Sequence, residues 1–176
     1  MTRLQILISS LIVFSCVLLT TVILASWKKS VRFAEVPVNL RRIYEGAAIH
    51  SNRAILKNVD GKIEMPWFPP STELTPSIRC CKNSKPSFCN PGGTDFLSYD
   101  PFQWETGSWK DLRFSIEKPH LFRYRFENTS TDLRKSFKAM AVWEPECDGR
   151  RSIFFRSAVL IDGKLDTALE IHRSDN

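Results

Sequence analysis

The feature that most constrains this chain is an apolar run near its start, Leu4 to Trp27, which contains no charged residue, no Gly and no Pro. At a rise of ~1.5 Å per residue, about 20 apolar residues in a helix span the hydrocarbon core of a bilayer, and a continuous helix satisfies its own backbone there. We therefore predict a transmembrane anchor helix over residues 1–27. A cleaved signal peptide is the alternative, but it needs a shorter apolar core and a better small-residue cleavage site than Ala25 and Ser26 provide.

The rest of the chain is long enough for one modest domain after the anchor. The formal net charge is +6, but Lys and Arg are scattered among acidic residues, which favours a solvated basic surface. Nucleic acid is therefore kept as an alternative partner and is not favoured. The densest basic group, Lys28, Lys29 and Arg32, directly follows the anchor. Because lipid headgroups would lie there, we expect inner-membrane lipid as a partner.

Cysteines form a second pattern. Cys16 lies in the apolar run, whereas Cys80, Cys81, Cys89 and Cys147 lie beyond it. Their even number and close spacing predict disulfides formed in an oxidising compartment. Because neighbouring cysteines do not readily pair with each other, we expect one bridge from Cys89 to Cys80 or Cys81, and a second from the remaining member of that pair to Cys147. A four-thiolate zinc site is the alternative, but the twin C-x₂-C spacing of such sites is missing.

The helical pattern continues beyond the anchor into a predicted extramembrane helix over residues 28–60. Pro37 removes one intrahelical hydrogen bond, so we expect it to kink or restart this helix. Asn58 to Gly61 supply a stop and a turn. One face of the helix carries an apolar stripe at a spacing of three to four residues: Val36, Leu40, Ile43, Tyr44 and Ala47.

The period of the apolar residues changes towards the end of the chain. Residues 61–108 hold most of the 10 prolines and are predicted to form a Pro- and Cys-rich loop region, because proline excludes long helices and central strands. Over residues 109–176 apolar residues alternate with polar ones, as in 112–116 and 122–126, which predicts an antiparallel β-sheet. The helical stripe is the best cover for its apolar face. The expected fold class is α+β, with a long N-terminal membrane-embedded helix packed on an antiparallel β-sheet.

The segment around the end of the anchor adds a resemblance to a known family. Two lysines follow the anchor, an Ala34-Glu35 step comes next, and an Asn39-Leu40 and Ile43-Tyr44 helix follows. Further along stand Phe68-Pro69, Thr75-Pro76 and Cys80-Cys81, and then strands over 109–143. In these features the chain resembles the type IV pilin and pseudopilin family, and bacterial minor pilins in particular. The resemblance implies a pilin-like fold and assembly with other pilin-like subunits through the N-terminal helix.

The resemblance also implies roles for single residues. Gln5 falls where the family has a carboxylate that pairs with a neighbouring subunit's N-terminal amine inside the apolar bundle. A neutral Gln5 offers hydrogen bonds there in place of a buried charge. Leu40, Ile43 and Tyr44 are the expected residues of the helix–sheet core and, with Gln5, the candidate assembly residues.

The expected function is therefore that of a pilin-like structural subunit or minor pilin of a type IV pilus or type II secretion system, acting by helix-bundle assembly. The expected location is a single-pass inner-membrane protein with its domain in the periplasm, or an assembled extracellular pilus. A count of positive charges around the anchor points to the cytoplasm instead, but the cysteines and the family's orientation outweigh it. The alternative function is a membrane-tethered periplasmic binding module for DNA or anionic glycan.

Catalytic motifs are missing from the sequence. It contains no G-x-S-x-G, Walker or G-x-G-x-x-G pattern, each of which would mark a nucleophile or a phosphate site. The histidines, His50, His120 and His172, lie far apart and outside metal-binding spacings. We therefore predict no enzymatic activity and no cofactor.

A weak candidate for a calcium site is the segment of Glu144, Glu146 and Asp148, which places acids at alternate positions before Gly149. This spacing resembles the start of a calcium-binding loop, in which carboxylates supply the oxygen ligands. The alternative is a polar hairpin turn that carries a cysteine, and this alternative is favoured.

Overall fold

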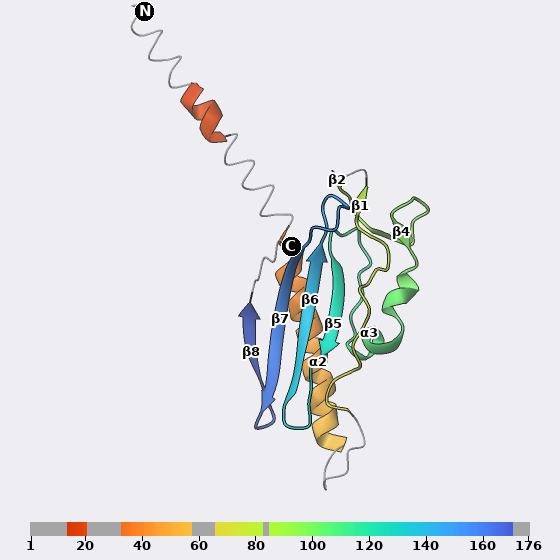
Figure 1. Cartoon of the computed structure of the whole chain (residues 1–176), viewed down its shortest axis with the longest axis vertical. Coiled ribbons are helices and arrows are strands. Elements are labelled where there is room, and N and C mark those ends of the chain that lie inside the picture. Colours follow the sequence, from red (N-terminus) through yellow and green to blue (C-terminus); the bar gives the residue numbers. More distant parts are fainter. Residues whose placement is uncertain (1–13, 21–32, 58–65, 83–84, 171–176) are drawn as a thin grey trace, which may run out of the picture. The chain divides into compact units, whose positions relative to one another are not determined.

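The computed structural model describes residues 14–20, 33–57, 66–82 and 85–170 (Figure 1). The chain divides into two compact units, Met1–Glu35 and Val36–Asn176, which are described separately. In the first unit, residues 14–20 are helical with exposed side chains. All strands and the helix α2 belong to the second unit, apart from the first residue of α2.

The membrane predictions need correction. Within the described ranges, no helix is both long enough and apolar enough to cross a membrane. The expected membrane-embedded helix and the single-pass inner-membrane location are therefore wrong as far as the described residues go. The long helix here is α2, Glu35–Lys57, whose exposed residues include charged ones, so it is an amphipathic cover for a sheet. Most of the apolar run, together with Gln5, lies outside the described residues.

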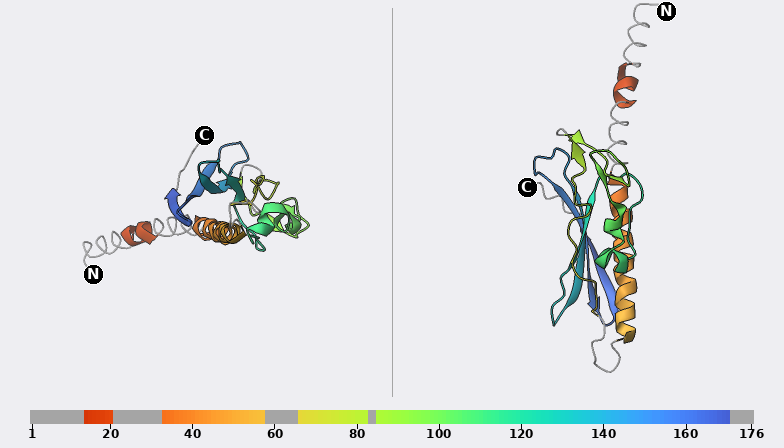
Figure 2. Two further views of the ribbon diagram at one scale, coloured as in Figure 1. Left: turned by 90° about the horizontal axis from the view of Figure 1, so that it is seen from below. Right: turned by 90° about the vertical axis from the view of Figure 1, so that its right-hand side faces the viewer.

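The second unit is built on a four-stranded antiparallel sheet in the order β5-β6-β7-β8. Its strands are β5 Arg123–Asn128, β6 Lys135–Trp143, β7 Ser152–Ile161 and β8 Lys164–Glu170. Helix α2 lies along one face of this sheet in all views (Figures 1 and 2). The fold class is thereby corrected to an amphipathic helix on a small antiparallel sheet, without a membrane-embedded segment in the described residues.

Shorter elements connect α2 to the sheet. They are the antiparallel pair β1 Cys81–Lys82 and β2 Lys85–Pro86, the parallel pair β3 Asn90–Pro91 and β4 Ser98–Tyr99, the 3₁₀ helix η2 Pro101–Trp104 and the helix α3 Gly107–Asp111. The expected strand over 112–116 is wrong. Leu112 caps α3, and Arg113 has a φ of 53°, which breaks an extended backbone. Leu112, Phe114 and Ile116 are nevertheless buried. The alternation therefore predicted which side chains are buried, but the strand that it also predicted does not form.

The outer edge of β5 is covered by a segment of the loop region, residues 71–75. Thr75 and Tyr124 exchange both backbone hydrogen bonds, at 2.8 and 2.7 Å. Thr72 N donates to Phe126 O at 2.8 Å, and the Thr72 hydroxyl accepts from Phe126 N at 2.9 Å. The Ser71 hydroxyl accepts from Asn128 N at 2.9 Å. This segment therefore satisfies the outward-pointing backbone groups of β5.

Close contact between α2 and its surroundings depends on one glycine. Gly46 faces the backbone of Leu112, and a Cβ added to it would lie only 1.9 Å from the Leu112 carbonyl oxygen. On the sheet side, Tyr44 packs on Phe137 with 6.1 Å between ring centroids, and Asn39 Nδ2 donates to Tyr124 Oη at 2.9 Å. These contacts fix the position of α2 on the sheet.

Candidate functional site

The outward face of α2, which we define as Val38, Arg41, Glu45, Ile49 and Asn52, is the first candidate surface. Val38 is 58% exposed and Ile49 is 42% exposed. Between them, Arg41 Nε and Glu45 Oε1 form an exposed ion pair at 2.8 Å, and such pairs add at most about 1 kcal/mol to stability. The face therefore combines aliphatic and charged groups that the fold itself leaves uncovered.

The inward face of α2 holds three of the predicted assembly residues. Leu40 and Ile43 are fully buried, and Tyr44 is half-buried. The Arg156 guanidinium lies over the Tyr44 ring, 4.4 Å from its centroid, a cation–π contact. Sequence reasoning missed Arg156, because a charged residue at an inward position of β7 breaks the apolar alternation. The sequence signal that could have indicated Arg156 is Tyr44, an aromatic residue on the apolar stripe of the helix that contacts it.

Two disulfides brace the loop region, and they confirm the predicted disulfide bonds. Cys80 pairs with Cys89, and Cys81 pairs with Cys147. The neighbouring cysteines thus bond to different partners, one nearby and one in the β6–β7 connection, 66 residues away. Pairing of all four thiols leaves no thiolate for the zinc site. Disulfides of this kind are typical of proteins from oxidising compartments.

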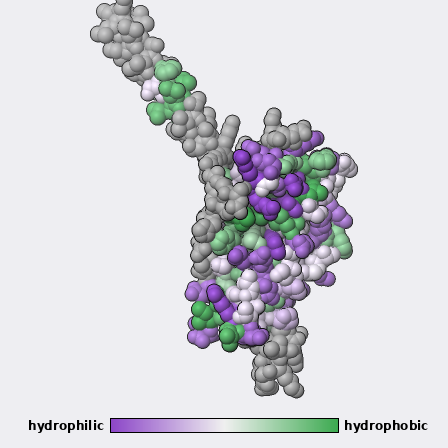
Figure 3. All heavy atoms as spheres, in the orientation of Figure 1, coloured by the Kyte–Doolittle hydropathy of each residue, from purple (hydrophilic) through white to green (hydrophobic). Residues whose placement is uncertain are grey.

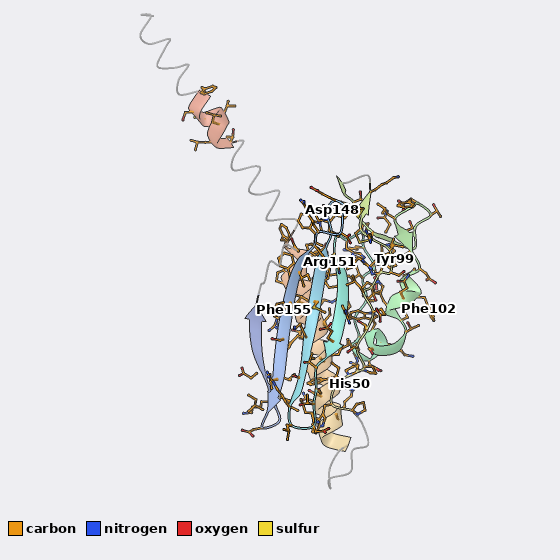
Figure 4. All side chains as sticks on the ribbon, in the orientation of Figure 1. His50, Tyr99, Phe102, Asp148, Arg151 and Phe155 are labelled. Carbon is orange, nitrogen blue, oxygen red and sulfur yellow. A yellow bond between two sulfur atoms is a disulfide. The ribbon has the colours of Figure 1, made fainter. Side chains whose placement is uncertain are left out.

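Two acids of the weak calcium candidate, Glu144 and Asp148, form ion pairs with different arginines. Glu144 is buried, and its Oε1 lies 3.2 Å from Arg79 Nη1. Asp148, labelled in Figure 4, pairs with Arg150 at 3.5 Å between Oδ2 and Nε. Among the described residues, no group of three His, Cys, Asp or Glu side chains is placed to hold a metal ion. The structure therefore does not bring Glu144, Glu146 and Asp148 together as a ligand set.

A buried polar chain lies beside β5, between segments that are far apart in the sequence. Trp104 Nε1 donates to Tyr99 Oη at 2.9 Å, and Tyr99 Oη lies 2.8 Å from His120 Nε2. His120 Nδ1 lies 2.7 Å from the Phe122 carbonyl oxygen. A neutral imidazole satisfies the chain, since Nδ1–H donates to that carbonyl while Nε2 accepts from Tyr99. Burial lowers the pKa of His120 to about 4.

This polar chain is structural in character. His120 is 2% exposed, so no substrate reaches its ring, and burial also raises the pKa of Tyr99. His50, labelled with Tyr99 in Figure 4, is not part of this chain of hydrogen bonds. It lies in the C-terminal half of α2, with its Nε2 3.1 Å from the Pro66 carbonyl oxygen. The sequence carries no spacing signal for the chain, because His120 lies 21 residues beyond Tyr99, in a separate segment.

Two of the described tryptophans, Trp104 and Trp109, lie in the core. Trp104 and Trp109 are buried with 5.1 Å between ring centroids, and Trp109 Nε1 donates to Thr75 Oγ1 at 2.8 Å. These two rings are therefore unavailable for stacking on bases or sugars. Comparison of the chain with family models, with curated proteins and with solved structures returned no match.

Proposed function

We propose that this chain is a pilin-like structural subunit, or minor pilin, of a type IV pilus or type II secretion system, and that it acts by assembly. The observation that carries the proposal is the difference between the buried and the exposed face of α2. On the face of α2 that packs on the sheet, Leu40 and Ile43 are buried. On the opposite face, Val38 and Ile49 are exposed. An amphipathic helix with aliphatic side chains on its free face is suited to pack against a neighbouring subunit.

Two further features support an assembly role. The disulfides Cys80–Cys89 and Cys81–Cys147 stiffen the loop region, which suits a subunit that works outside reducing compartments. The buried polar groups of the second unit, such as His120 and Tyr99, are enclosed in the core, where they stabilise the fold. Gln5 and the other residues of 1–13 and 21–27 lie outside the described residues, so their predicted contribution stays a prediction, whereas residues 14–20 are helical.

The test compares two charge insertions at exposed aliphatic positions in the full chain. Ile49→Asp places a carboxylate on the outward face of α2, and Leu133→Asp makes the same change at a fully exposed position in the β5–β6 turn. We expect I49D to abolish co-isolation with pilus or secretion-system proteins and to leave the melting temperature unchanged. L133D is expected to behave as the wild type. Co-isolation of I49D at the wild-type level would contradict the proposal.

A further inference from the structure

The face of the sheet that α2 does not cover carries a groove near the β5–β6 turn. Its volume is about 490 Å³, and it crosses β6 and β7. Figure 3 shows this face, on which hydrophilic residues occupy much of the described surface. No carboxylate lines the groove among the described residues. Its polar lining consists of four hydroxyl residues and two cations: Thr129, Thr131, Ser136, Ser157, Arg134 and Lys138.

The two cations are available to a ligand. Neither Arg134 nor Lys138 has a carboxylate within 4 Å in the part of the chain that the structure describes. Glu127 stands opposite Lys138 in the register of β5 and β6, but it pairs with Arg125 at 3.3 Å. Lys138 Nζ instead lies 5.0 Å from the centroid of Phe155, which Figure 4 labels on β7.

The hydroxyl groups on one side of the groove are held in place. Thr129 Oγ1 and Ser136 Oγ lie 2.9 Å apart, and Ser136 Oγ also lies 3.0 Å from the Thr129 carbonyl oxygen, to which it donates. Ser136 is buried, whereas Thr129 is exposed, and because a hydroxyl has two lone pairs, Thr129 Oγ1 keeps hydrogen-bonding capacity for a ligand. A fixed polar wall of this kind costs little ordering entropy on binding.

We propose that this groove binds an acidic saccharide, with sugar carboxylates on Arg134 and Lys138 and sugar hydroxyls on the Ser and Thr side chains. Charge complementarity selects an anion, and the hydroxyl lining selects a ligand rich in hydroxyls. The groove lies opposite α2, so saccharide binding and subunit assembly use separate surfaces.

Nucleic acid fits this groove less well. Double-stranded DNA carries one charge per about 1.7 Å of its axis, and binding it needs a longer row of cations than this pair. Lys138 covers the ring of Phe155, which hinders base stacking.

The test is a calorimetric titration of the full chain, with disulfides intact, with tetragalacturonate at low salt. Arg134→Gln and Lys138→Gln each remove one cation from the groove. Lys110→Gln is the matched control, because it makes the same change at an exposed position on α3. We expect the wild type to bind, each groove variant to bind about fivefold to tenfold more weakly, and K110Q to bind as the wild type.

A steric variant and two other ligands complete the test. Ser157→Leu fills the groove without a change of charge and is expected to abolish binding, while the melting temperature checks that each variant is folded. A neutral galactotetraose is expected to bind weakly or not at all. The proposal is overturned if tetragalacturonate does not bind, if K110Q weakens binding as much as K138Q, or if a 12-nucleotide single-stranded DNA binds more tightly than the saccharide.

Discussion

At the scale of single residues, the buried imidazole of His120 links the free energy of unfolding to pH. Burial lowers its pKa from 6.5 to about 4 in the folded chain. Between these values the unfolded chain binds a proton that the folded chain does not, so stability falls as the pH is lowered. At 1.36 kcal/mol per pKa unit, the loss between pH 6.5 and pH 4 is about 3 kcal/mol.

Urea denaturation of the wild type and of His120→Gln at a series of pH values between 4 and 7 measures this loss. Gln keeps a donor and an acceptor but does not titrate. We expect H120Q to be less stable at pH 7 and to have a flatter dependence on pH below 6.5. An equal slope for both proteins would show that His120 is not the acid-sensitive group.

Gly46 reverses the usual effect of glycine in a helix. Alanine normally stabilises a helix interior by about 1 kcal/mol relative to glycine. Here the new methyl group would clash with the Leu112 carbonyl oxygen, so we expect Gly46→Ala to destabilise the fold by about 1–3 kcal/mol. Asn52→Ala, at an exposed position on the same helix, is the control and is expected to be neutral or slightly stabilising. Melting temperatures that rise in both variants would contradict this prediction.

At the scale of elements, the two disulfides are expected to contribute unequally. In the chain-entropy model, closing the loop of 66 residues stabilises by about 4 kcal/mol and closing the loop of 9 residues by about 3 kcal/mol. Removing the Cys81–Cys147 bridge by a double serine substitution should therefore lower the free energy of unfolding more than removing the Cys80–Cys89 bridge. Urea titration of both double variants checks this order, and the reverse order would refute it.

Elements also show where sequence patterns were informative. The alternation of apolar residues predicted strands where β5, β6 and β7 lie, because burial on one face imposes a period of two. The same alternation over 112–116 gave the right buried residues and the wrong structure. Arg113 adopts a left-handed conformation after α3, and no residue pattern in the neighbouring sequence predicts this conformation. The sequence predicted that the neighbouring Cys80 and Cys81 bond to different partners, Cys89 and Cys147, but it left open which of the two bonds to Cys89.

At the scale of the whole molecule, the groove and the buried polar chain lay beyond sequence reasoning. Thr129 and Ser157 are ordinary turn and strand residues until the sheet register places them beside Lys138. The link from Trp104 through Tyr99 to His120 joins two separate segments. The apolar run near the start predicted a membrane-embedded helix, whereas the long described helix, α2, covers a sheet.

The covering of β5 by the segment around Thr72 and Thr75 has a consequence for how copies of this molecule meet. Exposed strand edges recruit foreign strands and start aggregation. Since the backbone groups along β5 already have partners, a stray strand cannot dock on that side without first displacing the segment. The sheet is thereby protected from the addition of foreign strands at its β5 edge, one of its two edges. Contacts between copies at this edge must therefore be made by side chains.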